Sequence, residues 1–239
     1  MVFRHIWIGW LILVAGVFWA GAARAGEQDL QIQKRAAARI PVDQLRQDMR
    51  EPVRRVLEEP TLYGRGPAEA FTGQADFYEW LLDHPDRGVE AWRRLGAKCQ
   101  SISDGGNGSF VWTDGHGSEL RWQTAYNSDS LRVWYADGKV RPALLMPAVP
   151  VHLVVLLRHG KRQESAARMM LFHQADVFLQ TDSKTAVLMT RMLGASAPRM
   201  AEQCLSQLET FFSGLAWYVD HHPERAEKLL AGKRHNPEP

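Results

Sequence analysis

The sequence predicts an α+β protein in which a curved antiparallel sheet of about six strands surrounds a long C-terminal helix, with extra helices before the sheet. From Cys99 to Gln180, apolar and polar residues alternate, and turn-forming residues separate short runs, as in strands joined by hairpins. On both sides of this region, apolar residues recur every three to four positions, as in amphipathic helices. With 45% hydrophobic residues and nine Trp, the 239-residue chain has enough apolar side chains for a sizeable core.

The first 25 residues predict an export signal. Arg4 precedes an apolar stretch from Ile6 to Ala23, and Ala23-Arg24-Ala25 is a small-x-small cleavage pattern with Gly26 as the first mature residue. The alternative is an uncleaved membrane anchor, because a stretch of 18 residues is just long enough to span a bilayer. We therefore expect an exported protein, periplasmic or secreted.

The basic character of the chain comes from this segment. It holds two of the 29 basic residues and no acidic one, so 27 basic residues would remain against 27 acidic residues after cleavage. A balanced charge gives no reason to expect nucleic acid as a partner.

The segment 26–67 is predicted to be a helical N-terminal extension, and 68–232 the main α+β domain, with a disordered tail at 233–239. The extension contains two expected helices and one expected loop. The helices cover 28–39 and 42–58, the second bent or broken before Pro52, and the loop covers 60–67. Two short helices, 75–84 and 86–95, open the main domain.

The predicted strands follow from alternation and turn signals. They cover 110–113, 119–126, 131–136, 140–146, 151–158 and 167–180. In the second strand, Leu120, Trp122, Thr124 and Tyr126 share one face. Asp137-Gly138 is a favoured hairpin dipeptide and predicts a turn after the third strand.

The chain then returns to helical periodicity. We expect a short helix at 185–193 and a long helix at 198–221. The long helix has a broad apolar stripe from Met200 to Val219 and an opposite polar face that includes Glu202 and Glu209.

The order of these elements over about residues 70–220 resembles the START-related helix-grip fold, mainly in the strand Phe172–Asp182, the short helix and the final helix Met200–Val219. The resemblance implies an apolar cavity between sheet and helix that holds a lipid, sterol or aromatic polyketide. The expected lining residues are large and apolar: Trp112, Trp122, Tyr126, Trp134, Met146, Phe172, Leu208, Phe211, Phe212 and Leu215. The alternative is that these side chains fill one another's space as a solid core.

The leading hypothesis is therefore non-catalytic binding of a hydrophobic small molecule or lipid, in proximity to a membrane. The alternatives are a cyclase or hydrolase on the same fold, favoured if His152, His173 or Asp176 face the cavity, and a solid-core envelope scaffold. The sequence does not predict an oligomeric state.

No residue pattern predicts catalysis, a cofactor or a metal. Arg158-His159-Gly160 resembles the signature of histidine phosphatases, but the 79 residues after it predict one strand plus helices, so we expect a polar hairpin loop at 159–164 instead. No His pair has the spacing of a metal site. Cys99 and Cys204 are a candidate disulfide, with two buried thiols as the alternative.

Overall fold

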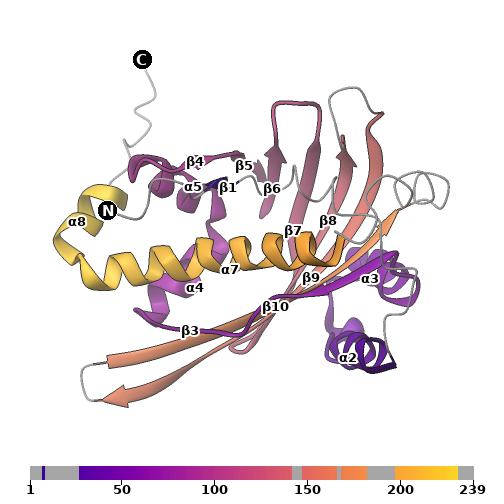
Figure 1. Ribbon diagram of the computed structural model, residues 1–239, viewed down its shortest axis with the longest axis horizontal. Helices are drawn as coiled ribbons and strands as arrows, with labels where there is room; N and C mark the ends of the chain where they lie inside the picture. The colour runs from indigo at the N-terminus through magenta and orange to yellow at the C-terminus, as the bar shows by residue number, and fades with distance from the viewer. Residues whose placement is uncertain (1–6, 9–26, 142–146, 166–167, 182–196, 231–239) are drawn as a thin grey trace.

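The computed structural model describes residues 7–8, 27–141, 147–165, 168–181 and 197–230. It confirms the predicted α+β class, with an open antiparallel sheet, helices before it and a long helix near the C-terminus (Figure 1). The sheet has eight described strands instead of about six. Five of them correspond to predicted strands, and three short strands at 62–65, 69–72 and 101–106 were not predicted, whereas most of the predicted strand 140–146 lies outside the described residues.

The strand order is β2-β10-β9-β8-β7-β6-β5, and β3 pairs with β10 beyond the end of β2. All of these pairings are antiparallel. The strands are β2 (Leu62–Arg65), β3 (Glu69–Thr72), β5 (Ser101–Gly106), β6 (Ser109–Thr113), β7 (Glu119–Asn127), β8 (Leu131–Val140), β9 (Val149–Ser165) and β10 (Arg168–Thr181). A separate ladder joins β1 (Trp7–Ile8) in parallel to β4 (Lys98–Cys99).

Helices cover both faces of the sheet (Figure 1). The outer face carries α2 (Glu27–Ala37), η1 (Val42–Gln44) and α3 (Gln47–Glu58). The inner face carries α4 (Ala75–Asp83), α5 (Pro85–Arg94) and α7 (Ala197–His221), and α8 (Pro223–Leu230) follows α7. Each covered face requires apolar side chains, which explains why the central strands are apolar at both odd and even positions.

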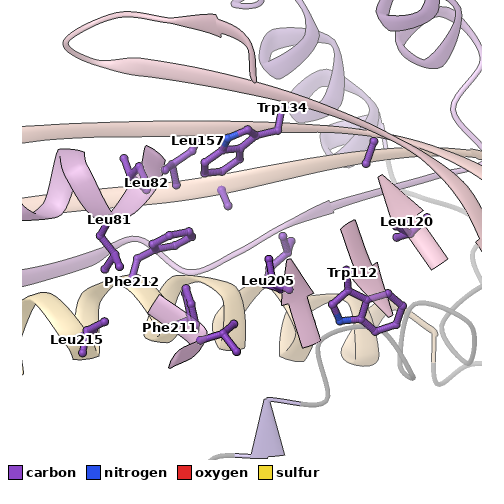
Figure 2. Close-up of a cluster of buried hydrophobic side chains, with 14 of the residues drawn as sticks. Leu81, Leu82, Trp112, Leu120, Trp134, Leu157, Leu205, Phe211, Phe212 and Leu215 are labelled. Carbon is purple, nitrogen blue, oxygen red and sulfur yellow. The ribbon is translucent and has the colours of Figure 1, made fainter. Parts of the chain in front are cut away.

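Two apolar clusters result from this arrangement. In β8, Val133 and Tyr135 belong to the outer cluster, whereas Trp134 and Ala136 belong to the inner one. Figure 2 shows the inner cluster, where side chains from the helices meet side chains from the strands.

The backbone of α7 runs closest to β2, β3 and β10. Across the middle of the sheet, large aromatic side chains bridge the wider distance to the helix. Trp134 of β8 stacks on Phe212 of α7 with ring centroids 6.1 Å apart. The inner core is therefore built from a helix that is anchored at one side of the sheet and supported by aromatic rings elsewhere.

The turn predicted at Asp137-Gly138 is wrong, because β8 continues through both residues to Val140. Gly138 pairs with Leu120 of β7, and a Cβ atom at this position would lie 2.2 Å from the carbonyl oxygen of Glu119. The glycine permits a close approach of two strands and does not form a hairpin.

The polar loop predicted at 159–164 is also wrong. β9 continues to Ser165 and pairs with β10 over its length, from Val151 opposite Thr181 to Ser165 opposite Arg168. The two strands form a long hairpin that runs below α7 to the lower left in Figure 1. The loop expected at 60–67 contains β2, and α3 runs through Pro52 with the break earlier, between η1 and α3.

The regular alternation predicted in β7 is interrupted by a bulge between Thr124 and Tyr126. Because a bulge adds one residue to a strand, it reverses the faces of the residues that follow. Ala125 and Tyr126 both pack with the outer cluster, whereas Leu120 and Trp122 pack with the inner one.

Several predictions lie outside the described residues. These are the signal segment except Trp7–Ile8, most of the strand at 140–146, the helix at 185–193 and the tail at 233–239. Among the helices that are described, none is long and apolar enough to cross a membrane.

Candidate functional site

The structure brings seven of the ten predicted lining residues into the inner cluster. They are Trp112, Trp122, Trp134, Leu208, Phe211, Phe212 and Leu215. The rings of Phe211 and Phe212 meet edge to face with centroids 5.0 Å apart, and Phe212 continues to Trp134. The contact between the sheet and α7 is thus made by the residue types that hydrophobic ligand sites use.

Trp112 is the largest of these residues that is completely buried, with 0% of its surface exposed. Its indole Nε1 has no hydrogen-bond partner within the described part of the chain. In contrast, the indole N–H of Trp92 donates to the carbonyl oxygen of Phe211 at 3.0 Å. Buried Trp N–H groups normally have a partner, so an indole N–H that has no acceptor among the described residues is unusual in this apolar cluster.

Two predicted lining residues lie on the other side of the sheet. Phe172 is 48% exposed, and its ring covers Gly160 of β9 on the outer face. Tyr126 faces the outer cluster because of the bulge in β7. Met146 is outside the described residues.

A row of polar residues crosses the inner face beside the apolar cluster. The register places His159 of β9, His173 of β10 and Glu69 of β3 side by side. His173 Nε2 lies 3.2 Å from Glu69 Oε2, and its Nδ1 lies 2.8 Å from the hydroxyl of Tyr78 in α4. Ser213 of α7 donates to the same Glu69 oxygen at 2.8 Å. Tyr78, His173, Glu69 and Ser213 come from four elements and are joined by hydrogen bonds; we call this set of residues the His173 network.

One proton arrangement satisfies the whole His173 network. Burial raises the pKa of Tyr78, so its hydroxyl keeps its proton and donates to His173 Nδ1. The hydrogen bond with His173 lowers the pKa of Glu69, with Ser213 adding to the effect against burial, so Glu69 is an ionised acceptor. His173 then carries its hydrogen on Nε2 and links a donor to a carboxylate, as in acid–base sites.

Next to this network is a cavity of about 10 Å³, the space of one water molecule. Its lining includes Tyr78, His159, Glu79 and Lys161. Nε2 of His159 is buried and has no partner among the residues described, and burial together with the charge of Arg132 lowers the pKa of His159. The inner polar row therefore ends at a small space with polar lining residues.

Glu209 of α7 was predicted on the solvent face of the helix but is fully buried. Its Oε1 accepts the backbone N–H of Ala175 at 2.7 Å, and Gly66 leaves room for the carboxyl group at the break between β2 and β3. Burial raises the pKa of Glu209 to about 8. The helical pattern could not reveal this position because the acceptor is needed only where the edge strand is interrupted.

A second polar cluster lies on the outer face, where Asp176 of β10 is fully buried. Its Oδ1 accepts the hydroxyl of Tyr63 at 2.5 Å and Nε of Arg65 at 2.6 Å. Nη2 of Arg158 lies 3.5 Å from Oδ2. Of the three residues that would favour an enzyme, only His173 faces inward, because Asp176 and His152 lie on the outer face, where His152 Nδ1 lies 2.9 Å from the Tyr135 hydroxyl.

Cys99 is a free, half-buried cysteine, and burial raises the pKa of its thiol to about 11. The side chain of Cys204 in α7 is outside the described set, so the predicted alternatives for this residue stay predictions. In the ranges that the structure describes, no group of three or more His, Cys, Asp or Glu residues is arranged to hold a metal ion.

Sequence reasoning did not find Tyr78, Glu69 or Ser213 as site residues. Glu69 falls in a strand that was not predicted. Tyr78 lies in a predicted helix, on the side that also buries Leu81 and Leu82, but the apolar pattern of that helix gave no reason to select it. His173 alone had a signal, as a histidine at an inward position of an alternating strand.

Comparisons with known proteins do not identify a family. No family model matches the chain, and no curated protein matches it. A conserved protein from Geobacillus kaustophilus is similar in structure at a TM-score of 0.41 and 12% identity, over 64% of this chain and 96% of that one. An uncharacterized protein from Rhizobium leguminosarum has a TM-score of 0.31 and 11% identity, over 63% and 97% of the two chains. At these TM-scores, neither likeness adds to the functional argument.

Proposed function

We propose that this protein binds a small hydrophobic molecule that carries a hydrogen-bond acceptor, between the inner face of the sheet and α7, in the manner of a helix-grip protein. The observation that carries the proposal is the indole N–H of Trp112, which has no acceptor among the described residues and is fully buried in the same cluster as Leu120 and Leu205. A ligand carbonyl, carboxylate or hydroxyl would supply the missing acceptor, and the surrounding apolar side chains would enclose the rest.

The arrangement of α7 supports the same proposal. Because aromatic rings bridge the helix to the middle strands, rotation of rings such as Trp134 and Phe212 would make room without separating α7 from β10.

The test uses cis-parinaric acid, a fluorescent fatty acid, titrated into the purified chain. We expect saturable fluorescence enhancement, and about three- to tenfold weaker binding by Trp112→Phe, which keeps an aromatic ring but removes the N–H donor. The matched control is Trp217→Phe, since Trp217 is 38% exposed on α7 and should not affect binding. Absence of binding by the unmodified chain, together with no bound molecule in native mass spectra of protein from its own host, would overturn the proposal.

Export is part of the proposed function and rests on residues 1–25 alone. The expected mature N-terminus is Gly26, which N-terminal sequencing of the protein from its host would identify. A chain that retains Met1 and sediments with membranes would support the anchored alternative instead.

A second candidate function is acid–base catalysis at the His173 network, and it is favoured by the chain of Tyr78, His173 and Glu69 beside the small cavity. Hydrolysis of p-nitrophenyl acetate is a simple screen. Activity that is lost in His173→Gln and kept in His152→Gln would support catalysis, because both histidines contact a tyrosine hydroxyl but on opposite faces of the sheet. Equal rates for both variants would exclude it.

A further inference from the structure

The outer face of the sheet carries more positive than negative charge around one buried carboxylate. Arg65 and Arg158 flank Asp176, with nitrogen to oxygen distances of 2.6 Å and 3.5 Å. Asp176 can neutralise only one guanidinium group. Tyr63 does not compensate for the other, because burial and its hydrogen bond to Asp176 raise its pKa and keep it neutral.

Arg39, between α2 and η1, adds a third positive charge from the helical layer above this face. It is close enough to contribute to lowering the pKa of Arg158, although burial of Arg158 is the larger cause. Arg39 forms no ion pair with any described residue. Arg65 and Arg158 contact the carboxylate and Arg39 lies within electrostatic range of Arg158, so this region has a formal surplus of two positive charges.

The two flanking arginines also have unused donors. Nη2 of Arg65 and Nε of Arg158 are buried and have no hydrogen-bond partner within the described ranges. Each of these side chains is 28% exposed as a whole, so the site is open to solvent on one side. Unpaired charge and unpaired N–H groups at a partly buried position are costly unless an anion occupies the site.

We propose that Arg39, Arg65 and Arg158 form a binding site for a phosphate group on the outer face of the sheet. A phosphate monoester carries a charge close to −2 near neutral pH, which matches the surplus, and guanidinium groups bind its oxygens through paired N–H donors. The site is separate from the space beneath α7, because Arg158 and the inward-facing His159 lie on opposite faces of β9. The same separation shows that Arg158 and His159 cannot act on one phosphate as in a histidine phosphatase.

The binding experiment is calorimetric titration of inorganic phosphate into the purified chain at constant ionic strength, with chloride as the reference anion. We expect saturable binding of phosphate and about tenfold weaker binding by Arg158→Gln. Arg39→Gln, which breaks no described ion pair, should also weaken binding and should fold like the unmodified chain. Arg54→Gln is the control, because Arg54 lies on α3, pairs with Glu51 and should bind phosphate normally.

Two further arms distinguish the source of the phosphate group. Glycerol 3-phosphate tests a soluble monoester, and vesicles of phosphatidate compared with phosphatidylcholine test a lipid headgroup. Binding in either arm that is reduced in both Arg158→Gln and Arg39→Gln supports the site and identifies its ligand. No phosphate binding by the unmodified chain, or equal binding by all variants, would show that the arginines only hold Asp176.

Discussion

Glu209 carries an ionisable carboxyl group into a fully buried position against β10. Its pKa is raised from the ordinary value of 4.5 to about 8, mainly by burial. Between these pH values, the folded state keeps a proton that the unfolded state releases. The contribution of Glu209 is therefore complete below about pH 4.5 and is lost as the pH rises through about 8.

Glu209→Gln should remove this pH dependence. The amide oxygen can still accept the N–H of Ala175, but the residue no longer ionises. We expect the variant to exceed the unmodified chain in free energy of unfolding by about 2–4 kcal/mol at pH 9 and to differ little at pH 5. Urea unfolding at the two pH values measures this, and a variant that is less stable at pH 9 than the unmodified chain would contradict the assignment.

At this scale, sequence patterns predict apolar burial better than polar burial. The pattern placed Phe211, Phe212 and Leu215 correctly because the helical period alone decides which side of α7 they occupy. It did not place Glu209 or Glu69, because each is held by a hydrogen-bond partner that is distant in sequence. The backbone N–H of Ala175 binds Glu209, and the ring Nε2 of His173 binds Glu69.

The helix α7 depends on aromatic bridges for its position over the middle strands. Phe212→Ala would remove the ring that stacks on Trp134 and contacts Phe211, and we expect a loss of about 3–5 kcal/mol in the free energy of unfolding. Trp217→Ala on the same helix is the control and should cost less than about 1 kcal/mol, since Trp217 is on the exposed side.

Chemical denaturation of both variants measures the difference. Similar losses for Phe212→Ala and Trp217→Ala would mean that α7 is held mainly by its contacts with β2, β3 and β10.

Prediction of whole elements succeeded where a single periodicity lasts for many residues. The helix at 198–221 and the strand at 167–180 agree with α7 and β10 within a few residues. Prediction failed where the same short residue pattern is compatible with two different structures. Asp137-Gly138 is a common turn, but here Gly138 permits close strand contact. The short strands β2 and β3 have no strand-like alternation in the sequence. They are strands because they pair with β10, which is distant in sequence.

The whole molecule needs the helices α2 and α3 to close the outer face. Val53 of α3 is completely buried against a cluster that includes Val154, Leu156 and Phe178. Val53→Asp should therefore cost at least about 3 kcal/mol, because it buries an unpaired charge, whereas the neighbouring exposed position tolerates Arg54→Asp.

Circular dichroism during thermal unfolding measures this effect. A cooperative transition of Val53→Asp at the temperature of the unmodified chain would mean that the 26–67 segment is an appendage and not part of the folded unit. The boundary predicted at residue 67 falls between β2 and β3, both of which pair with β10.

The pairing of β10 with β2 and β3 also sets the order of assembly. The strands from β5 to β10 follow one another along the sheet, so each can pair with its predecessor during synthesis. Arg65 and Asp176, by contrast, are 111 residues apart, and their strands pair only after the rest of the sheet has been made. A chain that crosses a membrane before folding meets no such delay, because all its strands are available together. In a chain that folds during translation, β10 is the last strand to be made, and the sheet remains incomplete until then. Slow synthesis would prolong this incomplete state, in which unpaired strand edges favour aggregation.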